Sequence, residues 1–402
     1  MLPGGWLRSL PSTFHYRDQT LDRSLLALYA GFVSKREQDP RLAKISVECY
    51  IKSLHTLRNS DVWVKKTPST AEINTTLATV LVLSRVELMS GEDGSGGYVA
   101  HIRAGLQLLK RLPPSISCDN ELTWMLAKRL RCLGFYNAAR QRRSFFMAQS
   151  PFDEWCFARP EEPDYLLQRA IDIAIGMPTI MEKADALDAS APMSENDLRR
   201  CLRAAKHLLE QAFDVTENLE QWLLETREAR LSSSIMQARD YASSGGVGGS
   251  RAENSPPYFD PSSYSLLISW YFCLRIYLFF LVKQLRTRHD TFSKLLANPP
   301  RLPLHLRTFE QNCATVDRYA WSIRRSVTTA LTASAFEAQE ALVLIFTLYR
   351  YWKEKGDDHN ALCCIYWLEE IKSQGLAVDV EVDERYAVVT ARFMGEHQSV
   401  AK

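Results

Sequence analysis

The sequence contains no C-x2-C pair, and none of its nine cysteines precedes Cys49. Structural zinc sites need closely spaced thiolates, so this scarcity excludes a zinc cluster of the usual kind. The patterns G-x-x-x-x-G-K-[ST], G-x-G-x-x-G, G-x-S-x-G and H-E-x-x-H are also absent. Nothing here indicates nucleotide, serine-hydrolase or zinc-protease chemistry. We therefore predict no catalytic residues, no cofactor and no metal.

A large excess of charge of one sign is lacking too. The formal net charge is +2, so the protein has no strong overall positive potential that would attract nucleic acid or an anionic membrane. The stretch from Met1 to Pro11 lacks the long apolar core of a secretory signal. The cysteines are scattered, with Cys363-Cys364 as the only close pair, which indicates free thiols in a reducing compartment.

One apolar run, residues 265–282 (SLLISWYFCLRIYLFFLV), is roughly long enough to span a bilayer. Arg275 lies at its centre, where a charge is costly in lipid. Arg286 and Arg288 follow closely, so the helix continues with the pattern of a water-soluble one. These charges favour a buried core helix over a membrane span.

Sustained alternation of apolar and polar residues is absent, and apolar residues instead recur at helical spacing. We predict an all-α fold, a single large helical bundle or array of about a dozen helices over residues 21–396. An irregular lead-in occupies residues 1–20. The Gly, Ser and Pro content of residues 232–261 predicts a flexible loop after a helix that ends near Arg230. A last helix is expected at about residues 382–394. Gly134 is expected to split the helix over residues 120–146, and Gly176 and Pro178 to kink or break the helix that begins at Asp164.

Helix boundaries are signalled most clearly between residues 39 and 112. Asp39-Pro40 predicts an N-cap and first helical residue, and Ser69 with Glu72 forms a capping box for the next helix. A third helix should begin near Tyr98. The first of these helices carries an apolar stripe made of Ile45, Cys49, Tyr50, Leu54 and Leu57.

Several polar residues were weighed as functional candidates. The cations between Lys128 and Arg143 fit a solvated helix face better than a phosphate-binding surface. His101 is expected to be a core histidine with a backbone partner rather than a catalytic base. Glu87 is expected to cap a helix or to pair internally, and it is no evidence of an acid/base dyad. His359 and Cys363, at positions i and i+4, could share a metal with a third ligand, but a cysteine on an apolar helix is interpreted as a small core residue rather than a metal ligand.

Arg275 is the remaining candidate, as an effector-binding or internal polar site. A buried guanidinium must be paired or reach solvent. We therefore expect Arg275 to meet a carboxylate from another helix or to line a polar cavity. A paired core arginine or one that reaches the surface is the favoured interpretation, and an anchor for an effector or substrate is the alternative.

The order of motifs from Tyr50 to Leu109 resembles the regulatory middle domain of fungal binuclear zinc-cluster transcription factors. The matching residues are Tyr50, Leu54, Leu57, Leu77, Leu81, Val82, Leu83, Glu87, Gly97, Tyr98, His101, Ala104, Gly105, Leu108 and Leu109. The family usually has Trp at the position of Tyr98 and Ala at that of Ser53. Residues 165–187, 341–352 and 363–375 resemble later helices of the same family.

The family's DNA-reading head uses two C-x2-C-x6-C clusters, which this sequence lacks. The resemblance therefore implies a transcriptional regulator without its own zinc-cluster DNA-binding motif, often one of a specialised (secondary) metabolite gene cluster. It implies a nuclear location, with the cytoplasm as the alternative. Expected partners are other transcription factors or transcription machinery, a small-molecule effector, or a second subunit in a homo- or heterodimer. Neither direct sequence-specific DNA binding nor membrane association is expected.

Two other interpretations stay open at this point. A headless protein of this kind could have been recruited as an enzyme or accessory protein for small hydrophobic biosynthetic intermediates. Alternatively, the gene model could be truncated upstream of a zinc cluster, which sequencing the 5′ end of the transcript would reveal. The regulator is the preferred interpretation, and no enzyme activity is predicted.

Overall fold

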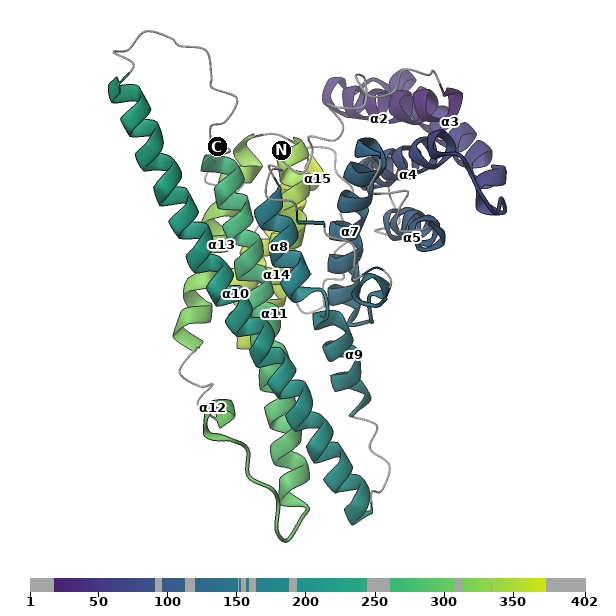
Figure 1. The fold of residues 1–402 in the computed structure, drawn as a ribbon. Coiled ribbons are helices and arrows are strands. Elements are labelled where there is room, and N and C mark those ends of the chain that lie inside the picture. Colours follow the sequence, from purple (N-terminus) through teal and green to yellow (C-terminus); the bar gives the residue numbers. More distant parts are fainter. Residues whose placement is uncertain are drawn as a thin grey trace. The chain divides into compact units, whose positions relative to one another are not determined.

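The computed structural model describes residues 18–90, 96–112, 120–150, 152, 157–158, 164–187, 194–243, 261–307, 313–333 and 335–373. Helices make up 86% of these residues, and no strand occurs among them. The expected all-α array is therefore confirmed (Figure 1). The boundaries expected for one domain over residues 21–396 stay a prediction.

The chain divides into two compact units. The central unit comprises Met1–Leu2 and Ala138–Ser326, and the terminal unit comprises Pro3–Asn137 and Val327–Lys402. Each unit is described by itself below. Both divisions fall within helices, since α7 (Glu121–Gln141) and α13 (Cys313–Ala333) each contribute residues to both units.

The terminal unit combines helices from the first third of the chain with helices near its C-terminal end. Its helices besides parts of α7 and α13 are α2 (Gln19–Glu37), α3 (Pro40–Arg58), α4 (Thr70–Ser90), α5 (Gly96–Arg111), α14 (Ala335–Lys355) and α15 (Asp358–Ser373), with a 3-10 turn at Asp61–Trp63. Helix α4 packs against both α2 and α5, and α14 packs against α15. In α4, Leu77, Val80 and Leu83 are each fully buried, so this helix lies at the centre of the group.

Helix α3 begins as its sequence predicts. The Asp39 carboxylate accepts a hydrogen bond from the Arg41 backbone N–H at 2.8 Å, and Pro40 is the first helical residue. The expected apolar stripe is only partly buried, because Ile45 and Leu54 are 41% and 37% exposed. Small residues face α2 instead.

The contact between α2 and α3 is close because its residues are small. The Ser46 hydroxyl donates to the Ala27 carbonyl at 2.7 Å. A Cβ atom at Gly31 would lie 2.8 Å from Ser46 Oγ, so glycine is what permits this approach. Large apolar side chains on α3 are consequently left on the outside.

The capping box at the start of α4 is also confirmed. The Glu72 carboxylate accepts bonds from the Ser69 backbone N–H and hydroxyl, both at 2.7 Å, and the Ser69 hydroxyl accepts from the Glu72 backbone N–H. The hydrogen bond from Lys65, with those from Ser69, lowers the pKa of Glu72 to about 2. This local chemistry accounts for the helix start without any tertiary contact.

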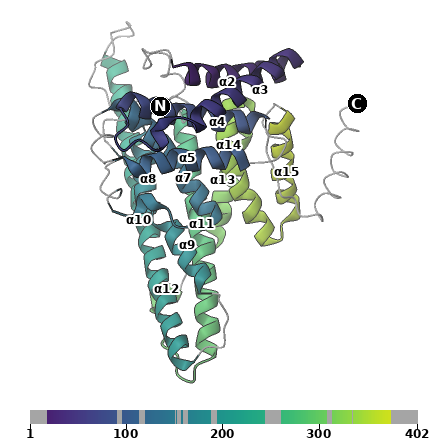
Figure 2. The same ribbon diagram turned by 90° about the vertical axis from the view of Figure 1, so that its right-hand side faces the viewer.

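The central unit is organised on two long helices that pack against each other, α10 (Glu195–Ser243) and α11 (Pro261–Lys294) (Figure 2). Helices α8 (Tyr165–Ala174) and α9 (Met177–Ala186) pack on both, and α12 (Leu304–Arg307) contacts α10. The break between α8 and α9 falls at Gly176, with Pro178 in the first turn of α9, as expected.

Four expectations about segments need correction or fall outside the described chain. Helix α10 continues to Ser243 rather than ending near Arg230, because residues 231–243 contain no glycine or proline to stop it. Gly134 does not split α7, which runs unbroken past this buried glycine. Residues 244–260 and the expected helix at 382–394 lie outside the described residues.

The apolar run lies within α11. Residues Leu267–Lys294 are long and apolar enough to cross a membrane by length and composition alone. However, 72% of the most apolar window is buried inside the protein. Trp270, Leu274 and Leu278 are at most 4% exposed, which is the pattern of a core helix.

Candidate functional site

Arg275 is buried on α11 and paired with a carboxylate from α10. Its Nη1 lies 2.6 Å from Glu220 Oε1 and 3.3 Å from the Tyr271 hydroxyl oxygen. The Arg275 side chain is 7% exposed, whereas that of Glu220 is 54% exposed. A guanidinium removed from water needs such partners, so the expectation of a carboxylate from another helix is met.

Aromatic rings complete the surroundings of Arg275. Its guanidinium carbon lies 5.9 Å from the ring centroid of Tyr271 and 5.8 Å from that of Tyr319, within cation–π range. Burial raises the pKa of Tyr271, so its phenol stays protonated. Trp222 of α10 stacks on Tyr271 with centroids 5.7 Å apart. The Arg275 guanidinium on α11 thus contacts side chains of both α10 and α13.

A shallow groove lies beside this cluster, between α8 and α10. Its volume is about 370 Å³, and it is lined by Arg169, Asp172, Ile173, Asn218, Gln221, Trp222 and Glu225. Trp222 links the groove to the arginine cluster, and its indole N–H donates to the Leu166 carbonyl of α8 at 3.0 Å. Arg275 does not line the groove, so its role as an effector or substrate anchor stays a prediction.

A second polar cluster lies in the terminal unit and joins α3, α4 and α5. The Tyr50 hydroxyl donates a short hydrogen bond to Glu87 Oε1, and it lies 3.2 Å from His101 Nε2. His101 Nε2 is 3.9 Å from Glu87 Oε1. Since the Tyr50 proton is committed to Glu87, this geometry suits a neutral His101 that donates from Nε2 to the phenolic oxygen.

Glycine makes room for this cluster. A Cβ atom at Gly97 would overlap the Glu87 carboxylate, so a larger residue there would displace this carboxylate from its present position. Gly105, further along α5, permits a different contact, because a Cβ atom there would lie 2.8 Å from Leu130 Cδ2 of α7. Burial lowers the pKa of His101, although the nearby Glu87 charge opposes this shift.

The protonation of His101 predicts a pH dependence of stability. The folded-state pKa lies below the ordinary value of 6.5, so the unfolded chain binds more protons and stability falls as the pH drops below 6.5. Tyr50 of α3 and Glu87 of α4 are the titratable groups that face the ring.

We expect His101→Gln to flatten the loss of unfolding free energy between pH 6.5 and about 5, measured by urea titration at each pH. His55→Gln, at an exposed histidine of α3, controls for the loss of a histidine elsewhere. An unchanged pH profile for His101→Gln would contradict the assignment.

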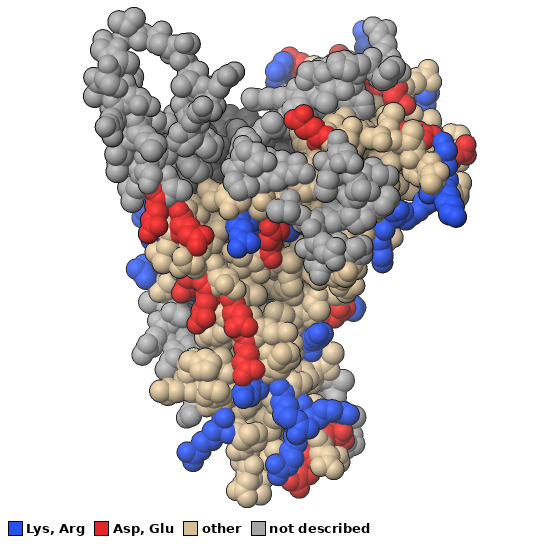
Figure 3. Space-filling view, viewed as in Figure 1, with Lys and Arg blue, Asp and Glu red and all other residues tan. Residues whose placement is uncertain are grey.

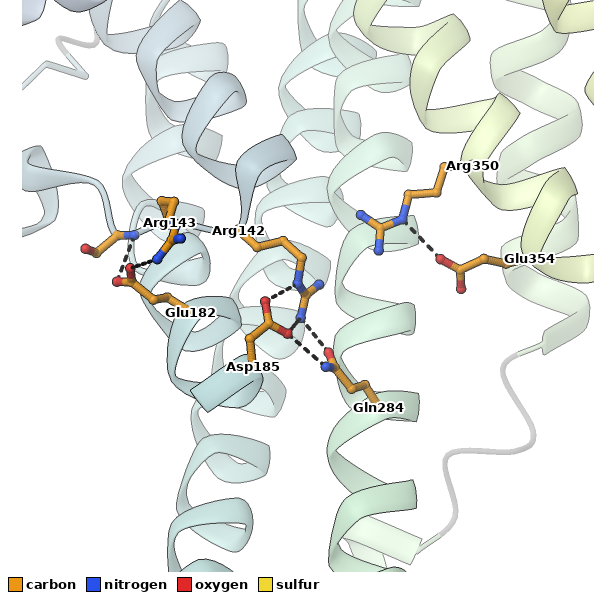
Figure 4. A network of polar contacts seen from close by, with 8 residues as sticks. Arg142, Arg143, Glu182, Asp185, Gln284, Arg350 and Glu354 are labelled. Carbon is orange, nitrogen blue, oxygen red and sulfur yellow. Dashed lines mark hydrogen bonds and ion pairs between the residues drawn. The ribbon is translucent and has the colours of Figure 1, made fainter. Parts of the chain in front are cut away.

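The basic segment at residues 128–143 is only in part the solvated face that its sequence suggested. Lys128 and Arg131 are 8% and 2% exposed. Arg142 makes two hydrogen bonds to Asp185 of α9, at 2.7 and 2.9 Å, and a short one to Gln284 of α11. Figure 4 shows this network, with Arg143 beside Glu182. Lys128, Arg131 and Arg142 are thus packed or paired in the fold, which neither sequence interpretation anticipated, whereas Arg140 and Arg143 are exposed.

Metal ligation finds no support in the described part of the chain. No group of three or more His, Cys, Asp or Glu side chains there could hold an ion. His359 is exposed on α15, whereas Cys363 is half-buried.

Sequence patterns identified Tyr50, Glu87, Gly97 and His101 separately but did not show that they meet. They missed Glu220, Trp222 and Tyr319 around Arg275, and Asp185 beside Arg142. No local signal marks these residues, because they become partners only when helices distant in sequence pack together. No protein-family model, curated protein or solved structure matches the chain.

Proposed function

We propose that the chain is a transcriptional regulator, of a fungal specialised-metabolite gene cluster, that acts through a helical regulatory domain without its own zinc-cluster head. It works in the nucleus with other transcription factors or transcription machinery. The chain binds and relays rather than catalyses, and a small-molecule effector is the input that suits such a domain.

One observation supports this proposal above all. The residues on which the family resemblance rests come from three separate helices, yet Tyr50, Glu87 and His101 contact one another. Gly97 leaves space for the Glu87 carboxylate in this contact, and Gly105 lets α5 pass close to Leu130 of α7. The resemblance therefore involves residues that contact one another in the fold rather than unrelated positions in the sequence. This is what we expect if the chain has the same domain as the family.

A tethered reporter tests the proposal. The chain is fused to an unrelated DNA-binding domain and transcription is measured from a promoter carrying that domain's site. We expect the fusion to change reporter output several-fold, and Tyr50→Phe to reduce this change because Glu87 and His101 lose the hydroxyl between them. Tyr29→Phe makes the same chemical change at a residue 53% exposed on α2 and should have no effect. A fusion that leaves the reporter at baseline would contradict the proposal.

The chain by itself should not bind DNA sequence-specifically. Its net charge is only +2, and Lys128, Arg131 and Arg142 are engaged in the fold rather than free to contact phosphates. Fluorescence anisotropy against promoter fragments should show only weak, salt-sensitive binding. Nanomolar, sequence-dependent affinity at physiological salt would overturn this expectation.

The alternative of an enzyme for hydrophobic intermediates draws no support from the groove. Five of its seven lining residues are charged or amide side chains, and Ile173 and Trp222 are its apolar contributors. Pockets for apolar ligands are lined mainly by hydrophobic residues. We therefore put forward no second function.

A further inference from the structure

The outer face of α10 carries an ordered charge pattern. Its positively charged residues come first and its negatively charged residues follow, in the order Arg199, Arg203, Lys206, Glu210, Asp214 and Glu217. Their spacings of three and four residues place them on one face of the helix. The buried residues Leu208, Ala212 and Leu219 lie on the opposite face.

No element in the described part of the chain covers these six side chains. Arg199, Lys206 and Glu210 keep 43%, 46% and 42% of their side chains exposed, and Arg203, Asp214 and Glu217 are exposed as well. Arg199 and Lys206 make intrahelical pairs with Glu195 and Glu210. Within the described part of the chain, no ion pair involves Arg203 or Asp214. In Figure 3, acidic side chains follow the middle of α10 and basic ones gather towards its lower end.

We propose that this face binds the same face of a second copy of the chain, with the two α10 helices antiparallel. A two-fold axis that passes between Lys206 and Glu210 places Arg199 opposite Glu217, Arg203 opposite Asp214 and Lys206 opposite Glu210. Symmetry repeats each of these unlike pairs on the other side of the axis. A parallel arrangement would instead oppose like charges, so the charge order selects the antiparallel one.

The contact is weak and electrostatic. Residues 199–217 span about 28 Å of helix at 1.5 Å per residue. Exposed ion pairs contribute little each and are screened by salt. The dimer should therefore form at high protein concentration and low salt and dissociate as salt rises. This inference does not depend on the proposed function.

Sedimentation velocity tests whether the full chain forms this dimer. The measurement is made under reducing conditions and at protein concentrations up to several hundred micromolar. The wild type should show a dimer at low salt that is lost at about 0.5 M salt. Arg203→Glu and Asp214→Arg should each weaken dimerisation about tenfold or more, because two symmetry-related attractions become repulsions. Arg227→Glu, an exposed charge change elsewhere on α10, should not.

The decisive test is whether swapping the two charges restores dimerisation. The double variant Arg203→Glu/Asp214→Arg should dimerise like the wild type, and an equimolar mixture of the two single variants should form a heterodimer. These residues are 11 positions apart on one helix, too far to pair within one chain. A wild type that is monomeric throughout, single variants that still dimerise, or a failed rescue in folded protein would each overturn the proposal. The reporter result would stand in any of these cases.

Discussion

Leu274→Ala is expected to lower the free energy of unfolding by about 2–5 kcal/mol. Leu274 is 2% exposed and lies on α11, at the centre of the central unit. Truncating it removes buried methyl groups and leaves a cavity that neighbouring helices can fill only partly. Urea titration followed by circular dichroism measures the change.

A matched leucine on α10 controls for the loss of the side chain itself. Leu224 is 52% exposed, so Leu224→Ala should change the free energy of unfolding by less than about 0.5 kcal/mol. Equal effects of the two substitutions would mean that α11 is not the core helix of this unit.

The Arg275–Glu220 pair should respond asymmetrically to mutation. Glu220→Ala leaves a buried guanidinium without its carboxylate and should cost about 2–3 kcal/mol of unfolding free energy. Arg275→Met leaves behind only Glu220, which is 54% exposed and stays hydrated. Met also packs well against the rings of Tyr271 and Tyr319, so this change should cost less than about 1 kcal/mol.

The double variant isolates the cause of the asymmetry. In the Arg275→Met background, Glu220→Ala should cause little further loss of unfolding free energy, because no buried charge is left unpaired. Equal costs for the two single variants would contradict the explanation by burial. If Arg275→Met keeps the fold but abolishes reporter activation, Arg275 belongs to an effector site. If both stability and output are unaffected, Arg275 is not needed for function.

Local chemistry in the sequence decides where many helices begin and end. Asp39 with Pro40, Ser69 with Glu72, and Gly176 act through hydrogen bonds and backbone angles within a few residues, so their effects were predictable. The burial of α11 was also predictable, because its apolar residues extend around the whole helix. The continuation of α10 past Arg230 was not, since a polar stretch without glycine or proline can be either helix or loop.

Tertiary packing alone decides which polar groups meet. Glu220 and Arg275 are 55 residues apart, and Tyr50 and His101 are 51 apart, so no local pattern links them. Packing also leaves Ile45 and Leu54 exposed, because Gly31 and Ser46 bring α2 and α3 together along a face of small residues. The physical reason is that helical periodicity specifies which residues share a face. Which neighbour covers that face depends on contacts between helices far apart in the chain.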